Sequence, residues 1–274
     1  MRYFAKLNRL AWKLWPIFTK FLSLIPSSII VSTSEKRWVK CYFDGQDFIY
    51  IWNNNALALM NFVTKPTNKV SANVQFFTQV YLPKFGDTVL DVGASYGTEM
   101  KFFSDLCGTE GKVICVEADL NAFRLMTKMA SHMGLKNVVL LNLAVSNISG
   151  IGFLESNWMH GTSNKFLKSN FDGSGLVISM KLEDIVDSLG LDKINFVKMN
   201  IEGAEYDALI GMGKKLKIVE HFCISCHDFL GVETATKDQV LELLRISNIE
   251  VVPPSLSNFE PWAKDYVFAQ KTEM

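Results

Sequence analysis

The sequence predicts an α/β protein with a mainly parallel β-sheet and helices on both faces of that sheet. Three observations support this prediction. Apolar strand-like runs alternate with amphipathic segments from residue 88 onward. Asp, Glu, Asn and His residues stand where several of these runs end, and such sheets bind ligands beyond the carboxyl ends of their strands. The 274 residues are 49 % hydrophobic and 20 % charged, which indicates a folded globular protein with a substantial core.

Residues 89–97 have the pattern of a strand followed by a glycine-containing turn and the start of a helix. Its apolar run ends on Asp91, and Gly93 and Gly97 follow before an amphipathic helical segment. Glycine in such a turn lets the backbone approach a ligand closely, and the start of a helix offers unpaired N–H groups. The next strand-like run ends at Glu117, whose carboxylate can accept both hydroxyls of a ribose. The pattern therefore predicts a nucleoside-containing cofactor.

The glycine spacing indicates which nucleoside. Dinucleotide sites use Gly-x-Gly-x-x-Gly, but this turn has Ser95 and Thr98 where the further glycines would stand. The spacing Asp-x-Gly-x-x-x-Gly is associated with S-adenosylmethionine, which has no pyrophosphate for the backbone to approach. The turn therefore favours a methyl donor, and the other interpretation is an ordinary strand-to-helix turn.

Charge and cysteine content exclude some classes of function. The net charge is zero, which gives no support to a nucleic-acid partner. The five cysteines, an odd number in apolar settings, predict buried free thiols in a reducing, cytoplasmic compartment. Cys223 and Cys226 have the spacing of a redox or zinc pair, but no second pair accompanies them and residues three apart on a strand point to opposite faces. No metal site is predicted.

Residues 1–34 form a basic N-terminal segment with no acidic residue. The uncharged run at 21–34 is too short to span a membrane, and no small-residue cleavage site marks a secretion signal. Two interpretations remain: peripheral contact with the inner membrane surface, or packing on the rest of the protein or in a homodimer interface. Four basic residues recur at gaps of four, three and four, which predicts a basic amphipathic helix: Arg2, Lys6, Arg9 and Lys13.

Residues 35–85 are predicted to form a hairpin and a helical cap. Strand-like runs at 37–43 and 47–52 flank Asp44-Gly45, a pair typical of two-residue turns. A helix is expected over residues 72–80 and would lead into the first core strand. The catalytic domain is then expected over residues 86–274.

The remaining segments continue the alternation of strands and helices. A loop is predicted over 156–175, with His160 as a candidate substrate contact. Thr236-x-x-Gln239 has the pattern of a capping box before a helix. Strands are predicted at residues 112–117, 138–145, 151–154, 177–180, 194–200, 222–225, 250–252 and 266–268.

Five blocks follow one another along the chain: residues 90–97, 116–119, 142–146, 182–185 and 197–205. Together these blocks resemble the FkbM family of S-adenosylmethionine-dependent methyltransferases. The resemblance covers about residues 86–228 and implies a Rossmann-like methyltransferase fold with a mostly parallel seven-stranded sheet. It also implies O-methylation of a hydroxyl of a sugar, glycan or secondary metabolite. Two positions depart from the family pattern, since Asn200 stands where Asp is usual and Ala118 where Pro is usual.

The strand ends also supply candidate catalytic groups. His227 is the first candidate for the base that removes the acceptor proton, because an ordinary imidazole titrates near ~6.5, and Asp228 would orient it. Glu202 is the second candidate, and its other interpretation is a cap on the following helix. The expected cofactor-binding residues are Asp91, Gly93, Ala94, Gly97, Glu117, Ala118, Asn142, Ala144 and Asn200.

Two other functions remain open at this point. A nicotinamide-dependent oxidoreductase would use a related sheet, although the glycine spacing argues against it. A non-catalytic S-adenosylmethionine-binding protein is the second alternative, because Asn200 replaces a carboxylate.

Overall fold

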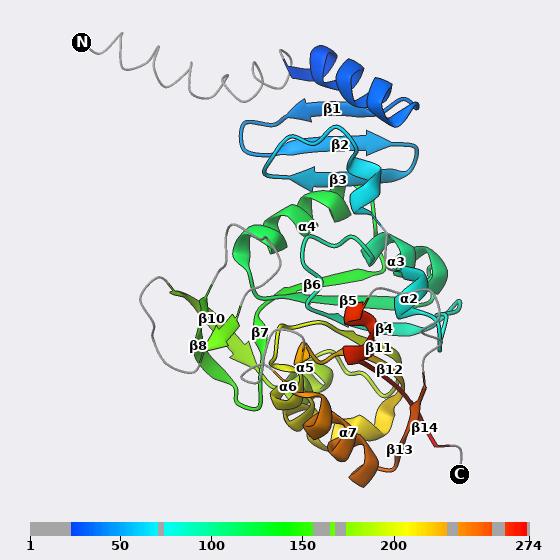
Figure 1. Cartoon of the computed structure of the whole chain (residues 1–274), viewed down its shortest axis with the longest axis vertical. Helices are drawn as coiled ribbons and strands as arrows, with labels where there is room; N and C mark the ends of the chain where they lie inside the picture. Colours follow the sequence, from blue (N-terminus) through cyan, green and yellow to red (C-terminus); the bar gives the residue numbers. More distant parts are fainter. Residues whose placement is uncertain are drawn as a thin grey trace, which may run out of the picture. The chain divides into compact units, whose positions relative to one another are not determined.

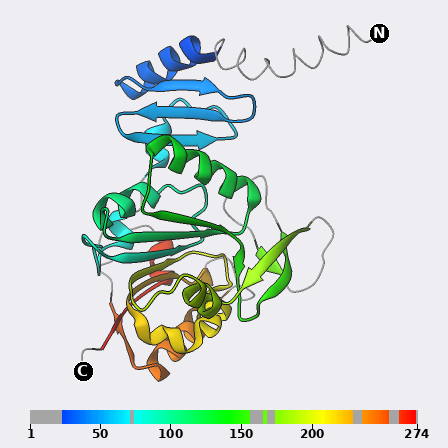
Figure 2. The ribbon, with the colours of Figure 1, turned by 180° about the vertical axis from the view of Figure 1, so that it is seen from behind.

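Contacts within a computed structural model of the protein divide the chain into two units (Figures 1 and 2). One unit contains residues 1–72 and 125–134, and the other contains residues 73–124 and 135–274. The domain boundaries predicted after residues 34 and 85 stay predictions. The structure describes residues 23–70, 74–155, 165–167, 174–228, 235–253 and 261–272.

The larger unit is built on a seven-stranded sheet with the order β13-β14-β12-β11-β4-β5-β6 (Figure 1). Only β14 runs antiparallel to its neighbours; all other pairs are parallel. The predicted Rossmann-like methyltransferase fold with a mostly parallel seven-stranded sheet is therefore confirmed. The strands are β4 (Thr88–Val92), β5 (Lys112–Glu117), β6 (Val138–Asn142), β11 (Ile194–Met199), β12 (Val219–Ser225), β13 (Ile249–Val252) and β14 (Tyr266–Lys271).

Helices cover both faces of this sheet, as predicted. On one face, apolar residues of three helices share a buried cluster with strand residues such as Leu90 and Val197. Successive strand residues point to opposite faces, so Phe196 points to the other face, where its ring centroid lies 5.9 Å from that of Phe103. The first face carries α5 (Leu182–Ser188), α6 (Glu205–Met212) and α7 (Lys237–Ile246), and the second carries α2 (Val74–Phe77) and α3 (Met100–Cys107).

After β6 of the main sheet, the chain forms a second, four-stranded sheet with the order β7-β10-β8-β9. Two of its strands correct the loop predicted over residues 156–175, because a strand forms within that range and another begins before its end. His160 lies outside the described residues. The strands are β7 (Ala144–Val145), β8 (Gly150–Glu155), β9 (Lys165–Leu167) and β10 (Ser174–Met180). The described part of this unit also includes the 3-10 helices η2 (Gly213–Ile218) and η4 (Pro261–Asp265).

The smaller unit contains a three-stranded antiparallel sheet of β1 (Lys40–Phe43), β2 (Phe48–Trp52) and β3 (Asn55–Leu59). A helix over residues 23–35, the 3-10 helix η1 (Pro66–Lys69) and the part of α4 (Leu120–Met133) from residue 125 onward complete it. The β3 strand was not predicted, because Asn53–Asn55 was interpreted as the end of the hairpin.

The two-residue turn predicted at Asp44-Gly45 is wrong. Phe43 pairs with Phe48, which leaves a four-residue loop. In that loop, Asp44 Oδ1 accepts the N–H groups of Gln46 and Asp47 at 3.0 and 2.8 Å, so the side chain closes the turn through local hydrogen bonds. The tight two-residue connection comes later, at residues 53–54, where Asn53 has a φ of 48°.

Two further predictions about helices differ from the structure. The helix expected over 72–80 is described only as α2, over Val74–Phe77. The capping box at the start of α7 is not formed, because the Thr236 side chain makes no cap hydrogen bond. Asp228 replaces it: its Oδ1 accepts the N–H groups of Thr236 and Lys237 at 3.0 and 3.1 Å.

All five cysteines are buried and free, as predicted. Burial raises the pKa of the Cys107 thiol to about 12, which keeps that sulfur protonated and unreactive. Within the described part of the chain, no helix is long and apolar enough to cross a membrane.

Candidate functional site

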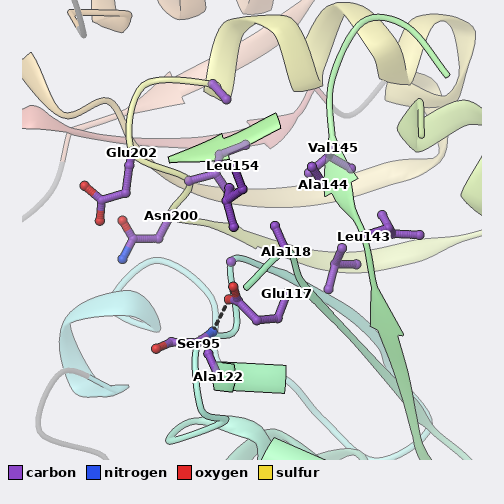
Figure 3. A pocket seen from close by; sticks show the side chains of 14 residues that line it. Ser95, Glu117, Ala118, Ala122, Leu143, Ala144, Val145, Leu154, Asn200 and Glu202 are labelled. Atoms are coloured by element: carbon purple, nitrogen blue, oxygen red, sulfur yellow. Dashed lines mark hydrogen bonds between the residues drawn. The ribbon is translucent and has the colours of Figure 1, made fainter. Parts of the chain in front are cut away.

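A pocket opens at the carboxyl ends of β4, β5 and β11 (Figure 3). The strand order proceeds from β4 through β5 to β6 in one direction and from β11 to β12 in the other. Open α/β sheets bind ligands at such a reversal of strand order. Five of the nine predicted cofactor-binding residues line this pocket: Gly93, Glu117, Ala118, Ala144 and Asn200.

The turn after β4 has an unusual backbone. Gly93, Ser95 and Gly97 have φ values of 78°, 51° and 81°, so three residues of one short turn adopt the left-handed region. A Cβ on Gly93 would stand 2.0 Å from the backbone oxygen of Asn200, which means that only glycine lets the ends of β4 and β11 approach this closely. Ser95 adopts a backbone conformation that costs free energy for any residue other than glycine. Residues with such strained backbone conformations are concentrated at functional sites.

Glu117 stands at the end of β5 and is 9 % exposed. Its Oε2 accepts the N–H of Ser95 at 2.7 Å (Figure 3), and its Oε1 accepts the N–H of Asp119 at 2.8 Å. Burial raises the pKa of Glu117 to about 7, against the opposing effect of these two hydrogen bonds. The carboxylate is therefore fixed in position, faces the pocket and changes its charge near neutral pH.

Three predicted cofactor residues support the pocket without lining it. Asn142 donates from Nδ2 to the backbone oxygens of Glu117 at 2.9 Å and Ala118 at 3.3 Å, and so holds the loop after β5. Ala94 donates its N–H to Val116 O at 3.0 Å, and Gly97 donates its N–H to Ala94 O at 2.8 Å. Their direct contact with a cofactor stays a prediction.

Asp91 is fully buried and also does not line the pocket. Its Oδ1 lies 2.9 Å from Lys198 Nζ, on the neighbouring strand β11. Lys198 also donates to Gly93 O at 2.9 Å, so this ion pair reaches the turn whose residues Gly93 and Ser95 line the pocket. Burial alone would lower the pKa of Lys198, but the carboxylates of Asp91 and Glu99 outweigh it and raise that pKa. The structure thus gives Asp91 a supporting place, and its predicted contact with the cofactor stays untested.

Asn200 presents a buried acceptor with no partner in the described structure. Its Oδ1 is shielded from solvent and makes no hydrogen bond to the described residues, although the side chain lines the pocket. Figure 3 shows Asn200 beside Glu202, with Glu117 across the pocket from both. A buried carbonyl oxygen without a donor costs free energy, so this atom indicates a ligand that carries a donor group.

His227 is held between two glutamates. Its Nδ1 lies 2.8 Å from Glu205 Oε1 and its Nε2 lies 3.4 Å from Glu202 Oε2. Burial alone would lower the pKa of His227, but the hydrogen bonds and charges of the two glutamates raise it to about 9. The ring is therefore a cation at neutral pH. A protonated imidazole cannot accept a proton, so the geometry does not favour the role of base that was predicted for it.

The Oδ1 atom of Asp228 caps α7 as described above, and its predicted role of orienting the His227 ring stays a prediction. The carboxylate beside His227 Nδ1 is that of Glu205. Glu202 lines the pocket with a side chain that is 16 % exposed, and its φ is 54°. Of the three predicted catalytic residues, Glu202 is the one that lines the pocket; catalytic roles for all three stay predictions.

The family model of the methyltransferase FkbM domain matches residues 91–247, more than half of the chain. The chain belongs to the FkbM methyltransferase family. The family match confirms the FkbM resemblance that was identified in the sequence.

Two curated relatives of this FkbM protein are named as methyltransferases. The hexuronic acid methyltransferase AglP of Haloferax volcanii is 26 % identical over 151 residues, which cover 55 % of this chain and 60 % of AglP. The 2-O-methyltransferase NoeI of Sinorhizobium fredii is 27 % identical over 166 residues, which cover 54 % of this chain and 66 % of NoeI. The chain thus spans less than two thirds of either relative.

A solved structure of Aeropyrum pernix fibrillarin with bound S-adenosyl-L-methionine has a TM-score of 0.44 to this FkbM protein. The two chains are 13 % identical, and the match covers 72 % of each.

Sequence reasoning missed Glu205 as a site residue of this FkbM protein, although it lies in one of the matching blocks. Glu205 is fully buried, and its Oε1 accepts the N–H groups of Ile201 at 3.3 Å and Gly203 at 3.1 Å. It therefore holds both His227 and the loop that carries Glu202. Its position three residues after Glu202 was the available signal, but only the fold shows that the carboxylate turns back under the loop.

Proposed function

We propose that this protein is an S-adenosylmethionine-dependent O-methyltransferase whose acceptor is a hydroxyl of a sugar or glycan. The observation that carries the proposal is the pocket at the reversal of strand order. It combines the carboxylates of Glu117 and Glu202 with the Oδ1 atom of Asn200, which has no hydrogen-bond donor among the described residues. Membership of the FkbM family supports methyl transfer. The names of the two relatives, which specify a hexuronic acid and a 2-O position, support a sugar acceptor.

The pocket residues fit this cofactor. Glu117 offers carboxylate oxygens to the two ribose hydroxyls, and Asn200 Oδ1 offers an acceptor to an amine or hydroxyl donor. Aliphatic side chains supply an apolar wall suited to an adenine ring. These are Val116, Leu143, Val145 and Leu154.

The protein contributes to the reaction by positioning the acceptor oxygen and by removing the proton of the acceptor hydroxyl. When bound, S-adenosylmethionine supplies a methyl group that is already activated on a sulfonium sulfur. Holding an acceptor oxygen in line with that group contributes roughly 7–11 kcal/mol in well-oriented systems. Glu202, at the pocket wall, accepts the proton of the acceptor hydroxyl. Protonated His227, fixed by Glu205, holds the Glu202 carboxylate in place.

Two alternatives make different predictions. The family match and the glycine spacing argue against a nicotinamide-dependent oxidoreductase. A non-catalytic S-adenosylmethionine-binding protein would keep the cofactor pocket and transfer nothing. Asn200, which replaces a carboxylate usual in the family, is the residue that keeps this alternative open.

The function is tested by methyl transfer from labelled S-adenosylmethionine to a panel of sugars. Hexuronic acids, neutral hexoses and lipid-linked glycans form the panel, and derivatives methylated at each hydroxyl in turn identify the position. We expect label on one hydroxyl of at least one sugar class, together with S-adenosylhomocysteine. Tight cofactor binding without transfer to any hydroxyl would support the non-catalytic alternative, and binding of a nicotinamide cofactor in preference would support the oxidoreductase.

Cofactor affinity is expected to depend on pH through Glu117. Its pKa of about 7 means that the carboxylate is ionised above and increasingly protonated below that pH. Because the ionised form accepts both ribose hydroxyls, the affinity for S-adenosylmethionine should fall about tenfold between about pH 8 and about pH 6. Calorimetric titration at each pH measures this. The variant Glu117→Gln should bind weakly and lose the pH dependence; a parallel pH profile in that variant would assign the titration to another group.

A further inference from the structure

The charge of the chain is distributed unevenly. Residues 1–72 contain ten Lys and Arg and three Asp and Glu, a net charge of +7, and residues 73–274 carry a net charge of −7. The three acidic side chains of the first part are engaged within the smaller unit. Glu35 accepts hydrogen bonds from Thr67, and Asp44 and Asp47 form ion pairs with Lys128. The neutral total thus conceals a strongly basic N-terminal part.

The helix over residues 23–35 lies along the β1 edge of the small sheet, as both ribbon views show (Figures 1 and 2). Its serine hydroxyls bind the backbone of that edge. Ser28 Oγ accepts Cys41 N at 2.8 Å and donates to Cys41 O at 3.1 Å, and Ser32 Oγ accepts Val39 N at 2.9 Å. These bonds satisfy an edge that would otherwise present unpaired groups, and they fix which face of the helix points inward.

The outward face of this helix carries no charged residue. Ile25, Ile29 and Ile30 are 62 %, 56 % and 51 % exposed, whereas Ser28 and Val31, on the inward face, are 2 % and 0 % exposed. The other exposed positions of the helix, Pro26 and Thr33, fall within the same arc. A surface helix of a globular domain normally presents charged or polar residues to solvent, so this apolar face is suited to a non-aqueous partner.

Basic and aromatic side chains follow directly at the end of this helix. Lys36, Arg37 and Lys40 are exposed, and Trp38 is 71 % exposed. Trp is enriched where a protein meets the headgroups of a bilayer, and each Lys or Arg near an anionic bilayer adds about 1 kcal/mol of attraction. The helix face and this cluster together have the chemistry of an interfacial anchor.

We propose that the smaller unit docks on an anionic lipid bilayer through this surface, which consists of Ile25, Ile29 and Ile30 with Lys36, Arg37, Trp38 and Lys40. The charged backbone of a nucleic acid offers no apolar surface that would bury the exposed isoleucine side chains. The boundary between headgroups and acyl chains of a membrane does bury such side chains favourably. The net charge of +7 over residues 1–72 provides the electrostatic attraction to anionic headgroups. The proposal does not depend on the reaction catalysed in the pocket.

Vesicle co-sedimentation of the full chain tests the proposal. Wild-type protein should bind mixed phosphatidylcholine and phosphatidylglycerol vesicles and bind pure phosphatidylcholine vesicles much more weakly. Lys36→Gln/Arg37→Gln should lower partition to the mixed vesicles about tenfold or more, because each basic residue contributes roughly fivefold. Ile25→Ser/Ile29→Ser should lower it about tenfold or more through lost apolar burial.

Matched controls remove the same groups elsewhere. Lys214→Gln/Lys217→Gln removes two exposed lysines of the larger unit, and Ile246→Ser removes an isoleucine that is 61 % exposed on α7. Both controls should bind vesicles like the wild type, and circular dichroism should show every variant folded. All substituted side chains are exposed, so folding is not expected to change.

Four outcomes would overturn the proposal. Equal binding to neutral and anionic vesicles would exclude the charged contact, and unchanged binding of Ile25→Ser/Ile29→Ser would exclude the helix face. Binding of a single-stranded RNA probe, lost in Lys36→Gln/Arg37→Gln and without vesicle binding, would assign the surface to nucleic acid. A dimer that Ile25→Ser/Ile29→Ser converts to a monomer, again without vesicle binding, would assign it to a second copy of the chain.

Discussion

Glu202→Gln is expected to lower the rate constant of methyl transfer, kcat, by about 10²–10⁴-fold. Glutamine keeps the shape of the side chain but cannot take the proton of the acceptor hydroxyl. The affinity for S-adenosylmethionine should stay within about twofold, because Glu117 and not Glu202 is placed to hold the ribose. Transfer of labelled methyl groups under saturating cofactor measures kcat, and calorimetry measures the affinity.

The pH profile of the wild-type rate separates Glu202 from His227 as the base. If the imidazole accepted the proton, the rate would rise until pH passed about 9, the pKa to which the glutamates raise His227. If Glu202 accepts it, the rate should be high while His227 is still protonated.

Glu242→Gln is the control for Glu202→Gln, because the Glu242 carboxylate is 59 % exposed on α7 and its loss should not affect kcat. A Glu202→Gln variant with wild-type kcat would remove Glu202 from the reaction.

Gly93→Ala is expected to reduce the free energy of unfolding by roughly 2–5 kcal/mol and to abolish cofactor binding. A φ of 78° is unfavourable for alanine by about 1–2 kcal/mol. In addition, the new Cβ would stand 2.0 Å from Asn200 O and must push the ends of β4 and β11 apart, an overpacking that costs about 1–3 kcal/mol. Denaturant unfolding measures the first effect and calorimetry the second.

Gly134→Ala separates the two contributions. Gly134 has a similar φ of 63°, but a Cβ there would meet no heavy atom of the other described residues within 4 Å, its immediate chain neighbours aside. Its substitution should therefore cost only the conformational part, about 1–2 kcal/mol, with cofactor affinity unchanged. Equal destabilisation in the two variants would show that the close approach at Gly93 contributes nothing to stability.

The fold was accessible from the sequence because its signals are local. Strand and helix periodicities are read within a few residues, and buried parallel strands appear as short apolar runs such as those before Asp91 and Glu117. The turn of β1 and β2 was misplaced for a physical reason. The Asp44 side chain closes a longer loop by hydrogen bonds that a dipeptide pattern does not indicate.

The chemistry of the site was only partly accessible. Strand-end positions correctly placed Glu117, Asn200 and Glu202 around one pocket, because parallel strands end at the same edge of the sheet. The charge state of His227 was not accessible, since it depends on two glutamates more than twenty residues away along the chain.

By itself the sequence determined the sheet, the glycine turn and the carboxylate of residue 117, each of which follows from short-range patterns. The tertiary structure alone decided how the ionisable groups pair: Asp91 with Lys198, His227 with Glu202 and Glu205, and Asp228 with the start of α7. The physical reason is that the charge of a buried group depends on its distance to other charges and to water. Those distances exist only once strands and loops far apart in the sequence have come together.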